Sequence, residues 1–317
     1  MSKVMFRYRR LPALTCGIAL LIGSGTLWAQ RGGAPADSAD RLLAGTIDIH
    51  VHSSPDSVER SVDAVEAAMM ARVRHMRGIV LKNHYDSTAP IVTLVRRLVP
   101  GVEVYGGIDL NLPAGGMNPA AVEHMAEILG GAGRVVWMST NDAENQVRFS
   151  KENRPFVSVS KNGALLQSTK DVIAVIAKHG LVLATGHVSA EEGLMLIREG
   201  RRQGVQHFVV THAMNTPIEM TIPQMQEAAR EGAFIEFAGQ SLRSRDAAER
   251  IQKFGDAIRA VGPASCILSS DLGQKTTPLP TDGFAQFLSA LSAKGFTDAE
   301  LDRMSRVNPA ALLGLSK

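Results

Sequence analysis

Two histidines, one residue apart, end an apolar run near the start of the chain. They are His50 and His52 in TIDIHVHSSPD, residues 46–56. Alternate side chains of an extended strand share a face, so the two imidazoles are expected side by side where the strand gives way to a loop. Such a pair suits a divalent metal ion, although two half-buried structural histidines would give the same pattern. The question is therefore whether other ligands follow.

Three more histidines and one carboxylate also follow apolar runs: His84 in LKNHYDS, His187 in ATGHVS, His212 in VVTHAMN and Asp271 in LSSDLG. The remaining histidines lack this placement, since they fall on helical stretches or at the start of a strand: His75, His124, His179 and His207. Imidazole nitrogens combined with a carboxylate oxygen favour zinc, with manganese, iron or nickel as alternatives. The pattern predicts a centre of one or two ions.

The elements that would position these residues alternate regularly from residue 41 onward. Helical patterns, several ending in glycine, separate eight short β-type runs at 46–51, 78–82, 102–110, 134–139, 181–186, 207–212, 233–238 and 266–271. This alternation predicts an α/β fold, a (β/α)8 TIM barrel, whose catalytic residues lie at the carboxyl ends of the strands. A doubly wound open sheet is the alternative, but no glycine-rich phosphate loop follows the first run.

Residues 141–170 are too long for an ordinary strand-to-helix loop. Within them Asn162 and Gly163 lie between two β-type runs, and Asn-Gly is a strong signal for a tight hairpin turn. We expect a small β-hairpin inserted after strand 4, either as a wall or lid of the site or as surface decoration.

The N-terminus has the layout of an export signal. Lys3, Arg7, Arg9 and Arg10 precede the uncharged run LPALTCGIALLIGSGTLWA, which small polar residues follow. We expect a signal peptide at 1–29, a flexible linker at 30–40 and one barrel domain at 41–317, in a protein exported to the periplasm or secreted. An uncleaved anchor and twin-arginine export are the alternatives.

The composition limits the kinds of partner. The chain has 317 residues, of which 45% are hydrophobic and 21% charged, with a net charge of +3. No basic stripe with interleaved aromatics points to nucleic acid, and no membrane contact is expected after signal cleavage. After cleavage Cys266 is the one cysteine left, so no internal disulfide is expected. We expect a small-molecule substrate, and the sequence does not predict an oligomeric state.

The order of the motifs resembles the amidohydrolase superfamily of metal-dependent hydrolases, and within it an uncharacterised subgroup with LKNHY, GGMNP and VVWMST stretches. The resemblance spans residues 46–275. It implies that His50, His52 and Asp271 hold the more buried metal, and that His187 and His212 hold the more exposed one. It also implies that Asp271 accepts a proton from the activated water.

One departure from the family pattern concerns the residue between the two metals. The family places a bridging carbamylated lysine or a glutamate at the end of strand 4, where this chain reads RVVWMSTNDAEN. Lys82 instead ends the second run, two residues before His84. Three roles for Lys82 stay open. It is a carbamylated lysine that bridges two metals, an ammonium ion that binds substrate, or a structural residue beside a single metal. His84 is a ligand or a substrate contact, so both join Asp271 as catalytic candidates.

Softer candidates lie in loops at the same face, where turn chemistry explains them equally well: Ser53, Asp56, Asn111, Gly115, Gly116, Asn118, Ser139, Thr140, Asp142 and Asn215. The favoured function is a metal-dependent hydrolase acting on a small ester, lactone, amide or cyclic amide. Alternatives on the same ligands are a decarboxylase and a phosphoesterase of the polymerase-and-histidinol-phosphatase type, whose closing Asp-x-His pair is lacking in SSDLGQ. A non-catalytic periplasmic binding or scaffold barrel is the alternative of another class.

Overall fold

Eight parallel strands form the centre of the protein, as the sequence predicts. The computed structural model describes residues 38–243 and 246–316, and its main sheet has the order β1-β2-β3-β4-β7-β8-β9-β10. The strands are β1 (Ile47–His52), β2 (Gly78–Lys82), β3 (Glu103–Asp109), β4 (Gly133–Trp137), β7 (Val182–Ala184), β8 (His207–Val210), β9 (Phe234–Ala238) and β10 (Cys266–Ser269). Val51 pairs with Leu272 just beyond β10. The backbone N–H of His52 also donates to the carbonyl of Leu272, over 2.8 Å. These contacts bring the first and last strands together into a barrel.

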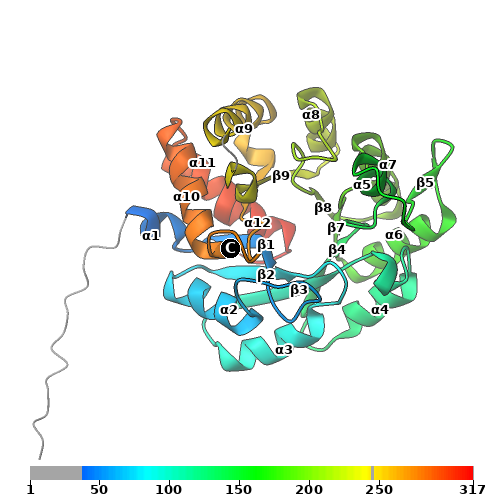
Figure 1. Ribbon diagram of the computed structural model, residues 1–317, viewed down its shortest axis with the longest axis horizontal. Coiled ribbons are helices and arrows are strands. Elements are labelled where there is room, and N and C mark those ends of the chain that lie inside the picture. Colours follow the sequence, from blue (N-terminus) through cyan, green and yellow to red (C-terminus); the bar gives the residue numbers. More distant parts are fainter. Residues whose placement is uncertain (1–37, 244–245, 317) are drawn as a thin grey trace, which may run out of the picture. The chain divides into compact units, whose positions relative to one another are not determined.

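Helices surround the strands in the (β/α)8 manner (Figure 1). They are α1 (Ser38–Leu43), α2 (Ala64–Val73), α3 (Ala89–Leu98), α4 (Pro119–Glu127), α5 (Glu144–Phe149), α6 (Gln167–His179), α7 (Ala190–Gln203), α8 (Ile222–Arg230), α9 (Ala247–Val261), α10 (Pro280–Ala293), α11 (Asp298–Asp302) and α12 (Asn308–Leu312). Short 3-10 turns are η1 (Leu112–Ala114), η2 (Gly239–Arg243) and η3 (Pro263–Ser265), and η4 (Arg303–Val307) is a π-turn between α11 and α12.

The alternation of each strand divides the apolar core into two layers. Val80, Trp137 and Val209 belong to an inner cluster, which residues of the C-terminal α12 region also join. Their strand neighbours, such as Leu81 and Val136, belong to the larger layer that packs against the helices. Because successive side chains of a strand point to opposite faces, both sides of every barrel strand are buried. This packing fixes the strand ends that carry the candidate site.

Local sequence signals set the helix ends. The side chain of Ser189 accepts from the backbone of Glu192, and the Glu192 side chain accepts from the backbone of Ser189, so the two form a capping box at the start of α7. Gly204 ends the same helix in the left-handed conformation. Asp63 and Glu66 form an equivalent capping box at the start of α2. These caps set where the loops that follow β1 and β7 end.

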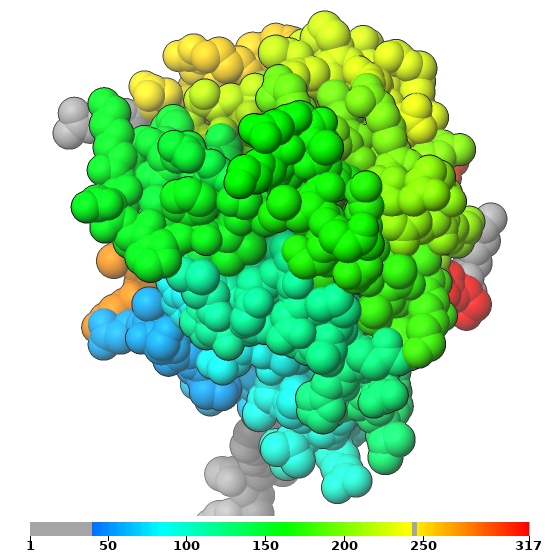
Figure 2. Space-filling model, turned by 90° about the vertical axis from the view of Figure 1, so that its right-hand side faces the viewer, coloured from blue at the N-terminus to red at the C-terminus, as the bar shows by residue number. Residues whose placement is uncertain are grey.

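The predicted hairpin insertion is confirmed. β5 (Ser160–Lys161) pairs antiparallel with β6 (Ala164–Leu165), and Asn162 and Gly163 between them both have positive φ, as a tight hairpin turn requires. The sequence did not predict α5, a short helix earlier in the same insertion. In Figure 2 the green residues of this part of the chain form much of the face turned to the viewer.

The predicted signal peptide at 1–29 lies outside the described residues, and so does most of the 30–40 linker. The first described helix, α1, begins at Ser38, within the last residues assigned to that linker. Among the helices of residues 38–243 and 246–316, none combines the length and the apolar character needed to span a membrane.

Candidate metal centre

Five histidines stand around the carboxyl end of the barrel and face one another in a closed series. We call this set the histidine circle: His50, His52, His84, His187 and His212. Going round it, neighbouring ring centroids are 5.2, 4.9, 6.4, 5.0 and 5.8 Å apart. The structure thus brings together five side chains that the sequence placed after four different strands.

The tightest part of the circle is the group of His50, His52 and Asp271. One carboxylate oxygen of Asp271 lies 3.1 Å from the Nε2 atom of each histidine. Potential ligand atoms of all three residues fall within 4.8 Å of one another, and all three residues are buried. His50 Nε2 and His52 Nδ1 are buried without a hydrogen-bond partner. Two buried imidazoles whose Nε2 atoms face the same carboxylate oxygen, one of them without a hydrogen bond, fit a divalent ion such as zinc.

His50 is oriented from behind by a residue that the sequence analysis missed. Glu236 of β9 lies 3.0 Å from His50 Nδ1 and also accepts from Ser269 Oγ and from the backbone N–H of His212, each over 2.7 Å. A carboxylate on one ring nitrogen fixes the tautomer and leaves the other nitrogen for a metal. The signal was a single charged residue inside the apolar strand FIEFA.

Electrostatics favour charged carboxylates in this group. Burial would raise the pKa of Asp271, but the charges and hydrogen bond of His50, His52 and His212 outweigh it and hold that pKa well below its usual range. Burial would likewise lower the pKa of His50, yet Asp271 and Glu236 raise it.

The rest of the circle consists of neutral imidazoles, the form that binds metal. Burial lowers the pKa of His52 and of His187 well below the ordinary value, and burial also lowers that of His212. His187 is held by Gln146 of the unpredicted helix α5, whose Oε1 lies 2.9 Å from His187 Nδ1. The insertion after β4 therefore supplies a residue that orients the circle.

A second polar group lies on the β2–β3 side of the circle. Lys82 Nζ is 2.8 Å from Asp109 Oδ2, and the Thr140 hydroxyl donates to the same oxygen over 2.9 Å. His84 Nδ1 lies 3.0 Å from Thr140 Oγ1 and 3.3 Å from Asp109 Oδ2. Burial would raise the pKa of Asp109, but Lys82 and His84 lower it to about 2, so this carboxylate is charged. Asp109, at the end of β3, was not among the sequence candidates.

Trp137 occupies the end of β4, where the family pattern would place a lysine or glutamate. Its ring lies 6.1 Å from that of His50 and 5.3 Å from the Lys82 ammonium. Trp137 belongs to the inner apolar cluster. Trp137 thus lies beside one member of each polar group.

Backbone irregularities aim several of these side chains. The β1–β2 register shifts between Asp48 and Val51, an irregularity of the strand that includes His50 and ends just before His52. His212 and Asp271 both adopt positive φ, at 23° and 50°, which is rare for residues with a Cβ and is common at functional sites. At Gly273 a Cβ would lie 1.8 Å from the carbonyl oxygen of His52, so only glycine allows this close approach.

The softer candidates divide into two sets. Asn111 supports the second polar group: its side chain donates to Thr140 Oγ1 and accepts from Ser139 Oγ and from the backbone of Thr140 and Asp142. The others serve loops and caps at the same face. Asn118 caps α4, Gly115 ends η1, Asp56 pairs with Arg60, and Asn215 accepts from Ser241. Buried Asp48, which the sequence missed, ties β1 to β10 by accepting from the backbones of His50 and Ser270.

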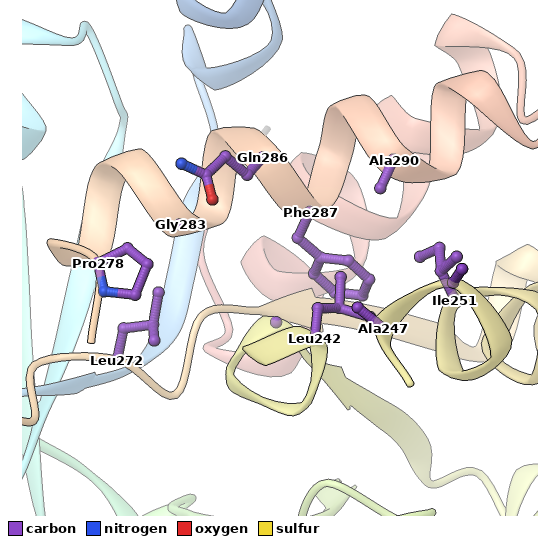
Figure 3. Close-up of a pocket in the computed structure, with 11 residues that line it drawn as sticks. Leu242, Ala247, Ile251, Leu272, Pro278, Gly283, Gln286, Phe287 and Ala290 are labelled. Carbon is purple, nitrogen blue, oxygen red and sulfur yellow. The ribbon is translucent and has the colours of Figure 1, made fainter. Parts of the chain in front are cut away.

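An apolar pocket of about 400 Å³ lies between η2, α9 and α10, beside the segment that follows Asp271. Figure 3 shows Phe287 of α10 turned toward Leu242, with Leu272 and Pro278 farther along the pocket. Its lining residues include no titratable side chain. This pocket therefore offers no acid, base or metal ligand, whereas the histidine circle does.

Several solved structures are similar to this chain in fold. An amidohydrolase from Pseudomonas aeruginosa matches with a TM-score of 0.57 at 13% identity, covering 87% of this chain and 98% of the other. An organophosphorus hydrolase from Deinococcus radiodurans has the same TM-score at 16% identity, with coverages of 87% and 94%. A third structure, from the engineering of organophosphate hydrolysis on a weak promiscuous lactonase template, gives 0.58 at 16%, with coverages of 89% and 98%.

Comparison with curated proteins found no match to this sequence. A family model described as a family of unknown function (DUF6282) matches residues 45–236, which reach from just before β1 to β9. The matched part contains all five histidines of the circle together with Lys82, Asp109 and Glu236, and Asp271 lies beyond it. The chain is a member of the DUF6282 family, and its (β/α)8 barrel is similar in fold to those solved structures.

Proposed function

We propose that this protein is a metal-dependent hydrolase of small molecules. The observation that carries the proposal is the buried group of His50, His52 and Asp271, whose ligand atoms lie within 4.8 Å of one another beside two orphaned imidazole nitrogens. A scaffold barrel would gain nothing from burying imidazole nitrogens that make no hydrogen bond, because each costs free energy. The amidohydrolase-type fold supports the same function.

In this proposal His50, His52 and Asp271 hold one ion, and His187 and His212 complete the site on its more exposed side. A divalent ion bound there would activate a water molecule and polarise a substrate carbonyl or phosphoryl group. Zinc is the favoured ion, and manganese, iron and nickel suit the same donors.

The residues of this chain have separate roles in the reaction. Glu236 holds the His50 ring so that its Nε2 faces the centre. The Asp271 carboxylate, whose side chain is 11% exposed, accepts a proton from the attacking water and passes it to the leaving group.

The proposed substrates are small esters, lactones, amides or cyclic amides. A lactonase template and organophosphorus hydrolases are among the structural neighbours, which supports including esters of carboxylic and phosphoric acids in a first search. A decarboxylase or a phosphoesterase would use the same residues, and a substrate panel separates them by product.

We also propose that the protein is exported, on the basis of the basic and apolar N-terminal segment. Expression of the full chain in a Gram-negative host, followed by fractionation and N-terminal sequencing, tests this. A mature periplasmic protein starting near residue 30 supports export, and an intact chain retained in the cytoplasm contradicts it.

The test of the proposed function combines metal analysis with hydrolysis. Purified protein is reconstituted with Zn²⁺ or Mn²⁺, and its metal content and its activity on the panel are measured for the wild type, His50→Ala and His124→Ala. His124 is an exposed residue of α4 and serves as the matched control. We expect His50→Ala alone to lose both metal and hydrolysis. Wild-type protein that binds no metal after reconstitution would refute the proposal.

A further inference from the structure

Lys82 is buried in an arrangement that leaves it little freedom. Its side chain is 0% exposed, and its ammonium lies 2.8 Å from Asp109 Oδ2 and 5.3 Å from the centre of the Trp137 ring. Both contacts favour a positive charge, one through an ion pair and the other through the negative face of an aromatic ring. A side chain without exposed surface also does not contact substrate.

A carbamate on Lys82 would reverse these interactions. It would replace the cation by an anion and place it against the Asp109 carboxylate, which is also buried. Two like charges at that separation in a buried site are strongly unfavourable. The negative face of Trp137 would repel the carbamate as well. The surroundings of Lys82 therefore do not fit a bridging carbamate.

The ion pair has another role, which is to hold His84. Thr140 Oγ1 gives its proton to Asp109 Oδ2, and both oxygens lie close to His84 Nδ1, at 3.0 and 3.3 Å. The Lys82 ammonium is farther from Nδ1, at 3.4 Å, and donates to Asp109 Oδ2 over 2.8 Å. We therefore assign His84 Nδ1 as an N–H that donates toward the two nearer oxygens. In that tautomer the lone pair of His84 is on Nε2, at the opposite edge of the ring. The side chain of His84 is 14% exposed, and its ring stands between those of His52 and His187.

The charges of the circle match one divalent ion. Asp271 and Glu236 contact its histidines, and among the residues that the structure describes neither forms an ion pair with a lysine or arginine. Together these two carboxylates balance one divalent ion. Asp109 cannot balance a second, because Lys82 already neutralises it. A second buried ion would thus carry uncompensated charge, which is costly.

We propose that Lys82 is the counter-ion of Asp109 and a positioning residue for His84, so that the centre has no lysine carbamate and holds one divalent ion per chain. This inference rests on the proposed metal centre. It assigns His84, rather than Lys82, as the residue of the second strand that faces the reacting groups. Lys82, which from the sequence could be the bridging lysine moved to another strand, then serves only to position His84.

The experiment measures bound metal per chain in proteins reconstituted with Mn²⁺ or Zn²⁺, with and without added bicarbonate. It compares the wild type with Lys82→Arg, which keeps the positive charge but cannot form a carbamate, and with the double variant Lys82→Met/Asp109→Asn, which removes both charges in case arginine does not fit. His50→Ala is the reference for loss of the centre, and circular dichroism checks that each variant folds.

We expect one equivalent of metal in the wild type whether or not bicarbonate is present, and one equivalent in whichever of the two Lys82 variants folds. Two equivalents that require bicarbonate, or loss of metal from folded Lys82→Arg and from the double variant, would overturn the inference while leaving the proposed function intact. Wild-type protein without any bound metal would instead refute the proposed function, and this inference with it.

The positioning role has its own readout. Nitrogen-15 NMR of histidine-labelled apoprotein reports which nitrogen of His84 carries the proton, with His84→Gln used to assign the signal. We expect the Nδ1–H form in the wild type and in Lys82→Arg, and a mixture of tautomers in the double variant. An unchanged His84 signal in the folded double variant would show that Lys82 and Asp109 do not position this ring.

Discussion

Two carboxylate–histidine pairs stand at different places around the same barrel mouth, and they differ in their charge. Among the described residues, Glu236 supports His50 and has no lysine or arginine as an ion-pair partner, whereas Asp109 supports His84 and is neutralised by Lys82. Both carboxylates are buried and both fix an imidazole through Nδ1. The first pair therefore contributes negative charge that a cation can balance, and the second pair contributes only orientation. A carboxylate–histidine pair therefore does not identify a metal site by its geometry alone, because nearby cations decide whether the pair can balance the charge of a metal ion.

The largest effect is expected when the Lys82 cation is removed from beside Asp109. Lys82→Met leaves Asp109 buried without its partner, so we expect a loss of about 3–5 kcal/mol in the free energy of unfolding. Urea unfolding followed by circular dichroism measures it. Lys82→Met/Asp109→Asn should regain most of the loss. If the single variant is as stable as the wild type, the ion pair does not have the importance assigned here.

A smaller effect is expected from the charged pair. Glu236→Gln keeps the shape of the side chain but removes the charge, so the affinity of the centre for metal should fall about 10–100-fold. Competition with a chelator measures the affinity. Glu123→Gln, in a surface ion pair with Lys178, is the matched control and should leave the affinity unchanged. Equal affinities for Glu236→Gln and the wild type would contradict the assigned role of Glu236.

The smallest effect concerns the hydroxyl that links the parts of the neutral pair. Thr140→Val removes a donor to Asp109, and we expect a loss of about 1 kcal/mol in stability with no change in metal content. The loss stays small because the Asn111 amide still donates to the backbone carbonyl of His84 over 2.6 Å. Thermal unfolding and metal analysis test the two parts separately. Loss of metal in this variant would show that the second pair belongs to the metal centre.

Much of the fold was predictable because its signals are local. Each barrel strand is a short apolar run between helical patterns, and Asn162-Gly163 specifies its own turn. The same locality explains which site residues were found, since the five histidines each follow an apolar run. The short helix α5 was missed because six residues inside a long loop carry too little periodicity to stand out.

The supporting residues could not be predicted in the same way. Asp109 and Glu236 acquire their roles from partners on other strands, 27 residues away for Lys82 and 186 for His50. Neither residue is part of a recognisable motif. A single charged residue within an apolar strand, such as the glutamate in FIEFA, nevertheless indicates a buried polar interaction. The meaning of Lys82 depends on the same long-range contacts. From the sequence a lysine near a histidine reads as a displaced bridge, while the structure places a carboxylate against it.

The most direct test of the account is a crystal structure of the protein grown with Mn²⁺, with anomalous scattering used to count the ions. The account predicts one ion, coordinated by His50, His52 and Asp271, with Lys82 unmodified and still paired with Asp109. Two ions joined by a carbamate on Lys82 would contradict it.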